Sequence, residues 1–193
     1  METTSEITPD PDVVFFYFSG SRDAPTPGYG AGEMISKGRE MEFEELAKIK
    51  GWRKQLSNFW IAPFRLDNLT WNTVEHYYQG AKFKNNNPEF YRSFSIESGS
   101  AISKDPLLAK AAGGKSGKCK GILLREAKVV IDDDYFNGRS HLEMERALHA
   151  KFSQHPELAK LLLLTNNATL THGTRGVPTA PMYGLMKVRA MLK

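Results

Sequence analysis

The stretch Leu56–Lys84, LSNFWIAPFRLDNLTWNTVEHYYQGAKFK, decides the fold predicted for this chain. From Trp71 onward its pattern is helical, because four residues recur at i, i+3, i+4 and i+7, the spacing of a core-facing helix stripe. These residues are Val74, Tyr77, Tyr78 and Ala81. Three polar residues repeat that spacing one position later, along one edge of the same helix: Glu75, Gln79 and Lys82. A carboxylate and an ammonium two turns apart on that edge are placed to bracket a ligand in a cleft.

Size and composition predict one intracellular globular domain, cytoplasmic or nuclear. A chain of 193 residues is long enough for a core that needs no metal or disulfide. Its single cysteine, Cys119, excludes an internal disulfide framework and indicates a reducing compartment. No apolar run approaches the roughly 18 residues of a membrane span, and the acidic, polar N-terminus is unlike a signal peptide. A net charge of +4 permits a phosphate-bearing partner.

The order of the predicted elements favours an α+β fold, a mainly helical single domain with a small sheet. Residues 1–12 are predicted as a disordered tail, and the apolar run Val13–Phe18 as a buried strand. Two short strands, 59–66 and 69–71, are predicted to meet at the turn Asp67–Asn68. The remaining segments carry helical spacing: 40–54, 106–112, 121–131, 140–152, 157–164 and 182–192.

Two capping boxes are predicted to begin helices. Asn72 is placed to cap the central helix with Glu75 at its third position, and Ser140 is placed with Glu143 in the same way. A glutamate in the first helical turn also lies at the positive end of the helix dipole, which favours its ionised form. Such a carboxylate can stabilise a developing oxocarbenium ion or position a water molecule. From the residues alone both roles of Glu75 stay open.

Two glycine-rich segments invite comparison with phosphate-binding motifs. Residues 28–32 hold three glycines, but not in the G-x-G-x-x-G spacing, so a mobile loop is favoured over a phosphate cradle. The segment GGKSGK at 113–118 lacks the first glycine of a P-loop, because Ala109 stands there. Its lysines are still suited to a diphosphate or a nucleic-acid backbone. No His or Cys spacing predicts a metal site, and no cofactor is expected.

Five motifs spread along the chain point to one known family. They are SNF at 57–59, APF at 62–64, W-x-T-x-EHYYQ-x-x-KF at 71–83, MERALHAKFSQHPELAKLLLL at 144–164 and LMKVRAML at 185–192. Together they resemble the NADAR family, also called the YbiA-like family, which is tied to ADP-ribose and N-glycoside chemistry. The resemblance covers most of the chain from about Phe15 to Leu192. It implies a YbiA-like domain over residues 13–193.

The resemblance also implies an N-glycosidase site on the central helix. Family members place their key acidic residue at the glutamate of EHYYQ, which is Glu75, and a lysine in the KF motif, which is Lys82. A semi-buried lysine with a lowered pKa can attack a sugar carbon, whereas a charged lysine can stabilise an anion. The resemblance implicates Lys82 without deciding between these roles. It further implies that Asn58 and Phe59 seat the nucleotide.

Six further residues complete the predicted substrate-binding set: Ser57, Trp71, Tyr78, Gln79, Lys118 and Tyr183. Aromatic side chains such as Trp71 and Tyr78 are more often core residues than ligand contacts. Gln79 is also explained as polar edging of the helix, and Lys118 as part of a solvated loop. For these residues the structural and the functional role both stay open.

Two segments depart from the bacterial YbiA-like sequences. Those carry an acidic, Trp- and Gly-rich stretch before the last helix, where this chain has the loop LTHGTRGVPTAPMYG at 170–184. His172, Arg175 and Tyr183 are candidates to replace its contacts. The insertion 29–54, absent from the short bacterial form, is open to interpretation as a lid, a partner surface or padding.

The resemblance favours an N-glycosidase that removes ADP-ribose from a nucleobase, with guanine in DNA or in nucleotides as the leading case. A second candidate is an N-glycosidase of phosphorylated riboflavin-pathway intermediates, against which the departure at 170–184 weighs mildly. A non-catalytic module that binds ADP-ribose or NAD is the alternative of a different class. The expected partners are an ADP-ribose-containing substrate and ADP-ribosylated DNA or RNA, with no membrane, and the chain is expected to be a monomer.

Overall fold

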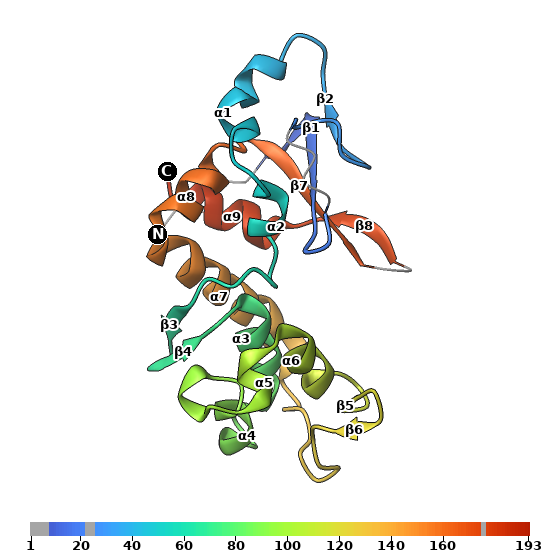
Figure 1. Ribbon diagram of the computed structural model, residues 1–193, viewed down its shortest axis with the longest axis vertical. Coiled ribbons are helices and arrows are strands. Elements are labelled where there is room, and N and C mark those ends of the chain that lie inside the picture. Colours follow the sequence, from blue (N-terminus) through green and yellow to red (C-terminus); the bar gives the residue numbers. More distant parts are fainter. Residues whose placement is uncertain (1–7, 22–25, 175–176) are drawn as a thin grey trace. The chain divides into compact units, whose positions relative to one another are not determined.

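The computed structural model describes residues 8–21, 26–174 and 177–193, which fold as two compact units. The sheet unit consists of the described residues of 1–57 and 155–193, and the helical unit of residues 58–154 (Figure 1). Helices and small sheets are segregated along the chain, which confirms the predicted α+β class. No helix in the described part of the chain is long and apolar enough to cross a membrane.

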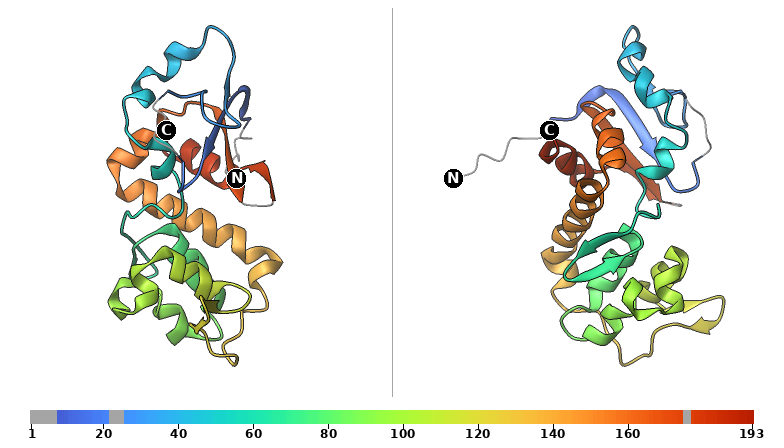
Figure 2. Two further views of the ribbon diagram at one scale, coloured as in Figure 1. Left: turned by 45° about the vertical axis from the view of Figure 1, so that its right-hand side comes forward. Right: turned by 60° about the vertical axis from the view of Figure 1, so that its left-hand side comes forward.

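The sheet unit is built on a four-stranded sheet in the order β2-β1-β7-β8. β1 (Asp10–Tyr17) pairs parallel with β7 (Ala168–Thr174), although the two strands are far apart in sequence (Figure 2). At one edge, β2 (Met34–Ile35) pairs antiparallel with β1. At the other edge, β8 (Val177–Pro181) pairs antiparallel with β7. The helical segments are η1 (Glu40–Phe43), α1 (Glu44–Ala47), α2 (Trp52–Gln55), α8 (Pro156–Leu163) and α9 (Tyr183–Met191).

Alternate residues of β1 form the centre of this unit's core. Val13, Phe15 and Tyr17 are each no more than 1% exposed, the period-two pattern of a strand with one buried face. Phe15 meets Phe43 and Trp52 edge-to-face, with ring centroids 5.0 and 5.4 Å apart. The buried strand predicted from the apolar run is therefore confirmed.

Two boundaries in the sheet unit differ from the predictions. β1 begins at Asp10, so residues 10–12 of the predicted tail belong to the strand, while residues 1–7 lie outside the described residues. The helix predicted for 40–54 is broken into three short segments, because Gly51 adopts a left-handed conformation with φ 66° before α2.

The stretch 170–184, predicted as a loop as far as the helix at 182–192, instead supplies most of β7 and all of β8 before α9 begins at Tyr183. Thr171 and His172 pair with Pro181 and Ala180 across the two strands. The backbone there is held by a sheet ladder, which a glycine- and proline-containing sequence did not indicate. Arg175 lies outside the described residues.

The glycine-rich loop 28–32 is organised by a carboxylate of the protein itself. Glu33 Oε2 accepts hydrogen bonds from the backbone N–H groups of Gly28 and Gly30, each at 3.0 Å. Arg53 donates to both oxygens of Glu33 at 2.6 Å, and both side chains are buried. Because Glu33 already occupies the N–H groups that a phosphate would need, the loop is not arranged as a phosphate cradle.

The helical unit is centred on α3 (Val74–Gly80). A hairpin of β3 (Phe64–Leu66) and β4 (Leu69–Trp71) leads into α3, which continues as η2 (Ala81–Phe83). α6 (Pro106–Gly113) and α7 (Ser140–Gln154) pack against α3. The other segments are α4 (Pro88–Arg92), η3 (Ile96–Ser98), α5 (Ala101–Lys104), β5 (Lys118–Cys119), β6 (Ile122–Leu123) and η4 (Tyr135–Arg139).

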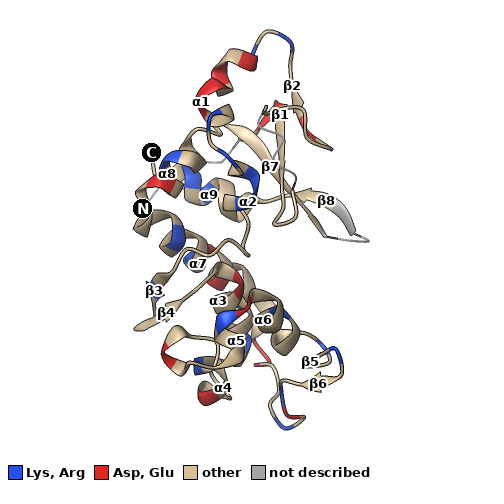
Figure 3. Ribbon diagram, in the orientation of Figure 1, with Lys and Arg blue, Asp and Glu red and all other residues tan. Residues whose placement is uncertain are grey.

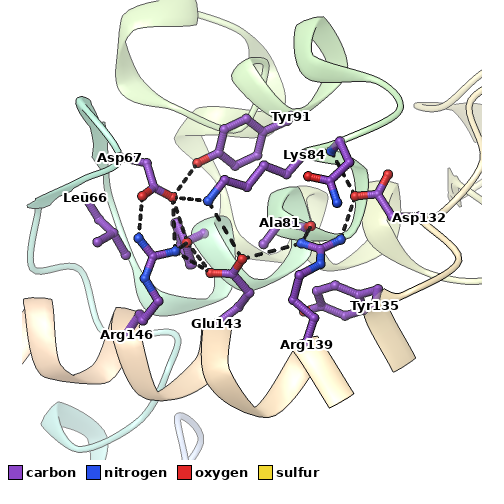
Figure 4. A network of polar contacts seen from close by, with 12 residues as sticks. Leu66, Asp67, Ala81, Lys84, Tyr91, Asp132, Tyr135, Arg139, Glu143 and Arg146 are labelled. Atoms are coloured by element: carbon purple, nitrogen blue, oxygen red, sulfur yellow. Dashed lines mark hydrogen bonds and ion pairs between the residues drawn. The ribbon is translucent and has the colours of Figure 1, made fainter. Parts of the chain in front are cut away.

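A polar network ties the β3–β4 turn to α3, α4 and α7 (Figure 4). Asp67 and Asn68 have positive φ angles of 54° and 61°, as a two-residue hairpin turn requires. The Asp67 carboxylate accepts from four side chains: Tyr77, Lys84, Tyr91 and Arg146. Burial alone would raise the pKa of Asp67, but these donors outweigh it and lower the pKa to about 2. Glu143, predicted to form a capping box with Ser140, instead joins this network by accepting from Tyr77 and Arg146.

Helix α3 begins one residue later than its predicted cap implies. Its N-cap is Thr73, whose Oγ1 accepts from the N–H of His76 at 3.2 Å. The predicted capping box of Asn72 and Glu75 is therefore wrong. Asn72 Nδ2 instead donates to the carbonyl of Ser103 at 2.7 Å. The carboxylate of Glu75 is thereby left to other partners.

The segment 121–131, predicted as a helix, begins with a hairpin strand. Lys120 and Gly121 have positive φ angles of 47° and 83° and make the two-residue turn between β5 and β6. Ile122 and Leu123, which suggested a core-facing stripe, are 67% and 56% exposed. The helical spacing in this segment therefore does not correspond to a buried face.

Candidate functional site

Three side chains along one edge of α3 and η2 form a hydrogen-bonded chain. Gln79 Nε2 donates to Glu75 Oε1 at 2.8 Å, and Lys82 Nζ donates to Gln79 Oε1 at 2.6 Å. Lys82 also donates to the carbonyl of Gly113, at the end of α6, at 2.9 Å. The i, i+4 and i+7 spacing thus joins a carboxylate and an ammonium through one amide, in the register that the sequence predicts.

Burial shifts the pKa of both Glu75 and Lys82, the outer two members of this hydrogen-bonded series. Glu75 is 6% exposed and Lys82 is 7% exposed. Burial raises the pKa of the Glu75 carboxyl, against the hydrogen bond from Gln79 and the charges of Lys110 and Lys82. Burial also lowers the pKa of the Lys82 ammonium to about 8, against the attraction of Glu75. A carboxyl that holds its proton more firmly and an amine that loses it more readily are suited to acid–base and nucleophilic chemistry near neutral pH.

Glu75 and Lys82 each keep one hydrogen-bonding position that a ligand can use. Among the described residues, the side chain of Glu75 accepts only from Gln79, at Oε1, and Oε2 has no donor. Lys82 uses two of its three ammonium hydrogens, on Gln79 and Gly113. In the described part of the chain, no three His, Cys, Asp or Glu side chains gather closely enough to hold a metal ion.

Aromatic rings lie around the Lys82 ammonium. Its Nζ is 5.8 Å from the ring centroid of Tyr78 and 5.7 Å from that of Phe136. Tyr135 packs edge-to-face on Phe136 and donates to the carbonyl of Tyr78 at 2.8 Å. Phe136 is nevertheless 64% exposed. An exposed ring beside a buried amine is suited to stack on a planar base.

Donors from outside α3 hold the backbone at Lys82. The N–H of Asp132 donates to the carbonyl of Lys82 at 2.7 Å, and Arg139 Nη1 donates to the carbonyl of Ala81 at 2.9 Å. Asp132 and Arg139 are joined by an ion pair of 2.6 Å (Figure 4). Carbonyls at the end of a helix have no partner inside it, so these external donors fix the point from which the Lys82 side chain extends.

Close packing of α6 on α3 makes Gly113 the tightest glycine among those described. A Cβ at Gly113 would lie 2.2 Å from Gln79 Oε1 and 2.8 Å from Gln79 Cβ. Gly113→Ala is therefore expected to lower the free energy of unfolding by about 1–3 kcal/mol and to displace Gln79 from its two partners. Urea denaturation measures the first effect. An unchanged denaturation midpoint would show that α6 shifts to accommodate the added methyl group without a loss of stability.

Two predicted contacts lie around Glu75. The carbonyl of Asn58 accepts from the N–H of Glu75 at 3.0 Å and so fixes the start of α3. The ring of Phe59 lies 5.6 Å from Lys110 Nζ, and the charge of Lys110 acts on Glu75. The structure therefore brings Asn58 and Phe59 to the region of the candidate carboxylate, while their contact with substrate stays a prediction.

Trp71 is a core residue of the helical unit. It is fully buried, and its Nε1–H donates to the carbonyl of Leu66 at 3.0 Å. Its ring packs against Tyr77 and Tyr91, with centroids 5.1 Å from each. Its polar atom and its ring contacts are therefore used inside the helical unit, which favours the core role, while contact of Trp71 with substrate stays a prediction.

The other predicted contacts are distributed over both units. Ser57 and Tyr183 belong to the sheet unit, in which Ser57 is buried and Tyr183 is exposed at the first residue of α9. Lys118 is exposed in β5 of the helical unit. Their roles as substrate contacts stay predictions.

Three neighbours of the site carry little signal in the sequence: Lys110, Gly113 and Phe136. Lys110 and Gly113 come from α6, which packs against α3, and Phe136 comes from η4, which is tied to α3 by the hydrogen bond from Tyr135 to the carbonyl of Tyr78. The glycine pair at 113–114 was the one available hint, because glycine permits a close approach of two backbones.

The chain matches a known family and shares a fold with a solved structure. The NADAR domain family matches residues 48–176, more than half of the chain. N-glycosidase YbiA of Escherichia coli (strain K12) is 35% identical over 118 residues, and that of Shigella flexneri serotype 5b (strain 8401) is 36% identical over 118 residues. Each alignment covers 61% of this chain and 61% of the relative's length. The NMR structure of the E. coli protein YbiA has a TM-score of 0.58 at 23% identity, covering 97% of this chain and 89% of that one.

Proposed function

Because the chain belongs to the NADAR domain family, we propose that it is an N-glycosidase, a hydrolase that splits the bond between a sugar carbon and a base nitrogen. The similarity to proteins named N-glycosidase YbiA supports this reaction class. The observation that carries the proposal is the buried chain of Glu75, Gln79 and Lys82. Its carboxyl has a raised pKa, and its amine has a pKa lowered to about 8.

In the proposed reaction the bond from ribose C1 to the base nitrogen breaks, and its electron pair leaves with the base, which takes up a proton. Positive charge develops on C1 and on the ring oxygen, and the carboxylate of Glu75 stabilises it. In one version the neutral amine of Lys82 attacks C1. The ring then opens to a Schiff base, and water releases the sugar and restores the amine. In the other version water attacks C1 directly, and the charged ammonium of Lys82 stabilises negative charge on the substrate.

The proposed substrate is ADP-ribose joined to guanine, in a nucleotide or in a nucleic acid. Two features of the helical unit support a substrate with a planar base and phosphates. The exposed ring of Phe136 beside Lys82 offers a stacking surface. The segment after the glycine pair 113–114 contains the basic residues Lys115 and Lys118. Phosphorylated riboflavin-pathway intermediates, which the resemblance to bacterial YbiA-like sequences implies, are the second candidate substrate.

A chromatographic assay tests the proposed function. Incubation of the protein with ADP-ribosylated guanosine and with ADP-ribosylated DNA is expected to release ADP-ribose and to restore the unmodified base. Heat-denatured protein and phosphorylated riboflavin-pathway intermediates are run in parallel. If only the phosphorylated riboflavin-pathway intermediates were cleaved, the second candidate substrate would replace ADP-ribosylated guanine. Binding of ADP-ribose with no release from any substrate would identify a non-catalytic reader.

A further inference from the structure

The net positive charge of this chain lies in one short segment. Residues 115–128, KSGKCKGILLREAK, contain five Lys and Arg residues and one Glu, a net charge of +4. The whole chain has 26 Lys and Arg against 22 Asp and Glu, also +4, so 21 basic and 21 acidic residues cancel in the remainder. We call residues 115–128 the basic hairpin, because they contain β5, β6 and the turn between them. Figure 3 shows the Lys and Arg positions around these strands.

The basic hairpin presents three lysines to solvent. Lys115, Lys118 and Lys120 are exposed, and Lys120 lies in the turn between the strands. None of the three forms an ion pair with another described residue, whereas Lys128 pairs with Glu126 at 2.9 Å. Three unpaired ammonium groups on one hairpin form a site for a polyanion, since each can neutralise one phosphate.

The base of the hairpin is joined to the candidate site. Arg125 Nη1 donates to the two carbonyls on either side of Gly113, at 2.9 Å each. The carbonyl of Gly113 itself accepts from Lys82. A cavity of about 530 Å³ opens beside Arg125 and is also lined by Lys115 and Lys118. The cavity beside the hairpin lysines is therefore linked to Lys82 through Arg125 and the carbonyls of residues 112–114.

We propose that the basic hairpin binds the phosphate backbone of a nucleic-acid strand. Lysine side chains contact phosphates without reading bases, so the hairpin positions the strand and leaves recognition of the modified base to the site. An acidic protein or an anionic membrane would meet the same charges, and the test separates these partners from nucleic acid.

The test compares two variants with the same loss of charge. The hairpin variant carries Lys115→Gln, Lys118→Gln and Lys120→Gln. The control variant carries Lys37→Gln, Lys50→Gln and Lys104→Gln, which removes three exposed lysines elsewhere. Fluorescence anisotropy measures the binding of an unmodified single-stranded oligonucleotide of about 20 nucleotides, at salt concentrations from about 50 to 200 mM. Circular dichroism checks that both variants fold.

Wild-type protein and the control variant are expected to bind the oligonucleotide with affinities that agree within about twofold. The hairpin variant is expected to bind at least about tenfold more weakly, with the slope of log K against log salt reduced by about two, since each phosphate contact on a single strand contributes about 0.7. Equal weakening in both variants would overturn the proposal, because net charge alone would then explain binding. Capture by phosphatidylserine vesicles or by a polyglutamate peptide, without binding of the oligonucleotide, would also overturn it.

The oligonucleotide carries no ADP-ribose and is not turned over, so the result does not depend on catalysis. Cleavage of ADP-ribosylated guanosine by a protein that does not bind the oligonucleotide would defeat the hairpin proposal alone. Hairpin-dependent binding by a protein that cleaves no glycoside would defeat the proposed function alone.

Discussion

Replacing Glu75 with Gln is expected to slow cleavage of the N-glycosidic bond by about a thousandfold or more while leaving the fold intact. The substitution preserves the shape of the side chain and an oxygen that can accept from Gln79. It removes the negative charge that would oppose the developing positive charge on the sugar. Single-turnover kinetics on a substrate that the wild-type protein cleaves measure the rate. Circular dichroism and the thermal midpoint verify the fold.

Glu89→Gln provides the matched control for this experiment. Glu89 is exposed on α4, and the same loss of one charge at that position is expected to leave the rate at the wild-type value. A wild-type rate in the Glu75→Gln protein would remove Glu75 from the mechanism. A slow reaction accompanied by a strongly lowered thermal midpoint would assign Glu75 a structural role instead.

Replacing Lys82 with Met is expected to slow the reaction by a similar factor of about a thousand. Both versions of the mechanism require the nitrogen of Lys82, and Met fills a similar volume without it. Lys82→Arg separates the versions, because a guanidinium keeps the charge but does not form a Schiff base. If the amine attacks the sugar, borohydride added during turnover traps a covalent sugar adduct on Lys82, which mass spectrometry of peptides locates. An active Lys82→Arg protein with no adduct would exclude the Schiff base and leave the electrostatic role. Lys104→Met, at an exposed position on α5, is the control.

The dependence of the rate on pH gives the same distinction without a substitution. Burial sets the pKa of Lys82 at about 8, so the side chain is mostly protonated below that pH and mostly neutral above it. An attacking amine must be neutral, and the rate then rises as the pH increases through about 8 and levels off above it. A stabilising ammonium must be charged, and the rate then falls over the same range. The sign of the change around pH 8 therefore identifies which form of Lys82 acts.

Local periodicity was sufficient to predict the central part of the candidate site. A helix repeats every 3.6 residues, so the positions of Glu75, Gln79 and Lys82 on one edge follow from the sequence alone once α3 is recognised. The partners from other elements do not follow in this way. Gly113 and Asp132 meet Lys82 only because α6 and the turn before α7 pack at the end of α3. Such contacts depend on the tertiary fold and leave no fixed spacing in the sequence.

Helix starts and short segments show where local rules were insufficient. Asn72 and Thr73 are both good capping residues, and the choice of Thr73 is decided by Ser103, whose carbonyl engages the Asn72 amide. The segment after Lys120 carries helical spacing, but positive φ angles at Lys120 and Gly121 turn the chain back on itself before a helix can form. In the first case one side-chain hydrogen bond decided between two neighbouring caps, and in the second two backbone positions overrode a helical pattern.

The bridge that Arg125 makes to the carbonyls flanking Gly113 has a thermodynamic consequence. The carbonyls of residues 112–114 accept hydrogen bonds both from Arg125, at the base of the hairpin, and from Lys82, so a partner that shifts Arg125 changes the environment of the Lys82 ammonium. Such coupling is reciprocal. The factor by which an oligonucleotide changes the affinity for a small ligand at Lys82 must equal the factor by which that ligand changes the affinity for the oligonucleotide. A substrate fragment too small to touch the hairpin would then still slow amide hydrogen exchange along it.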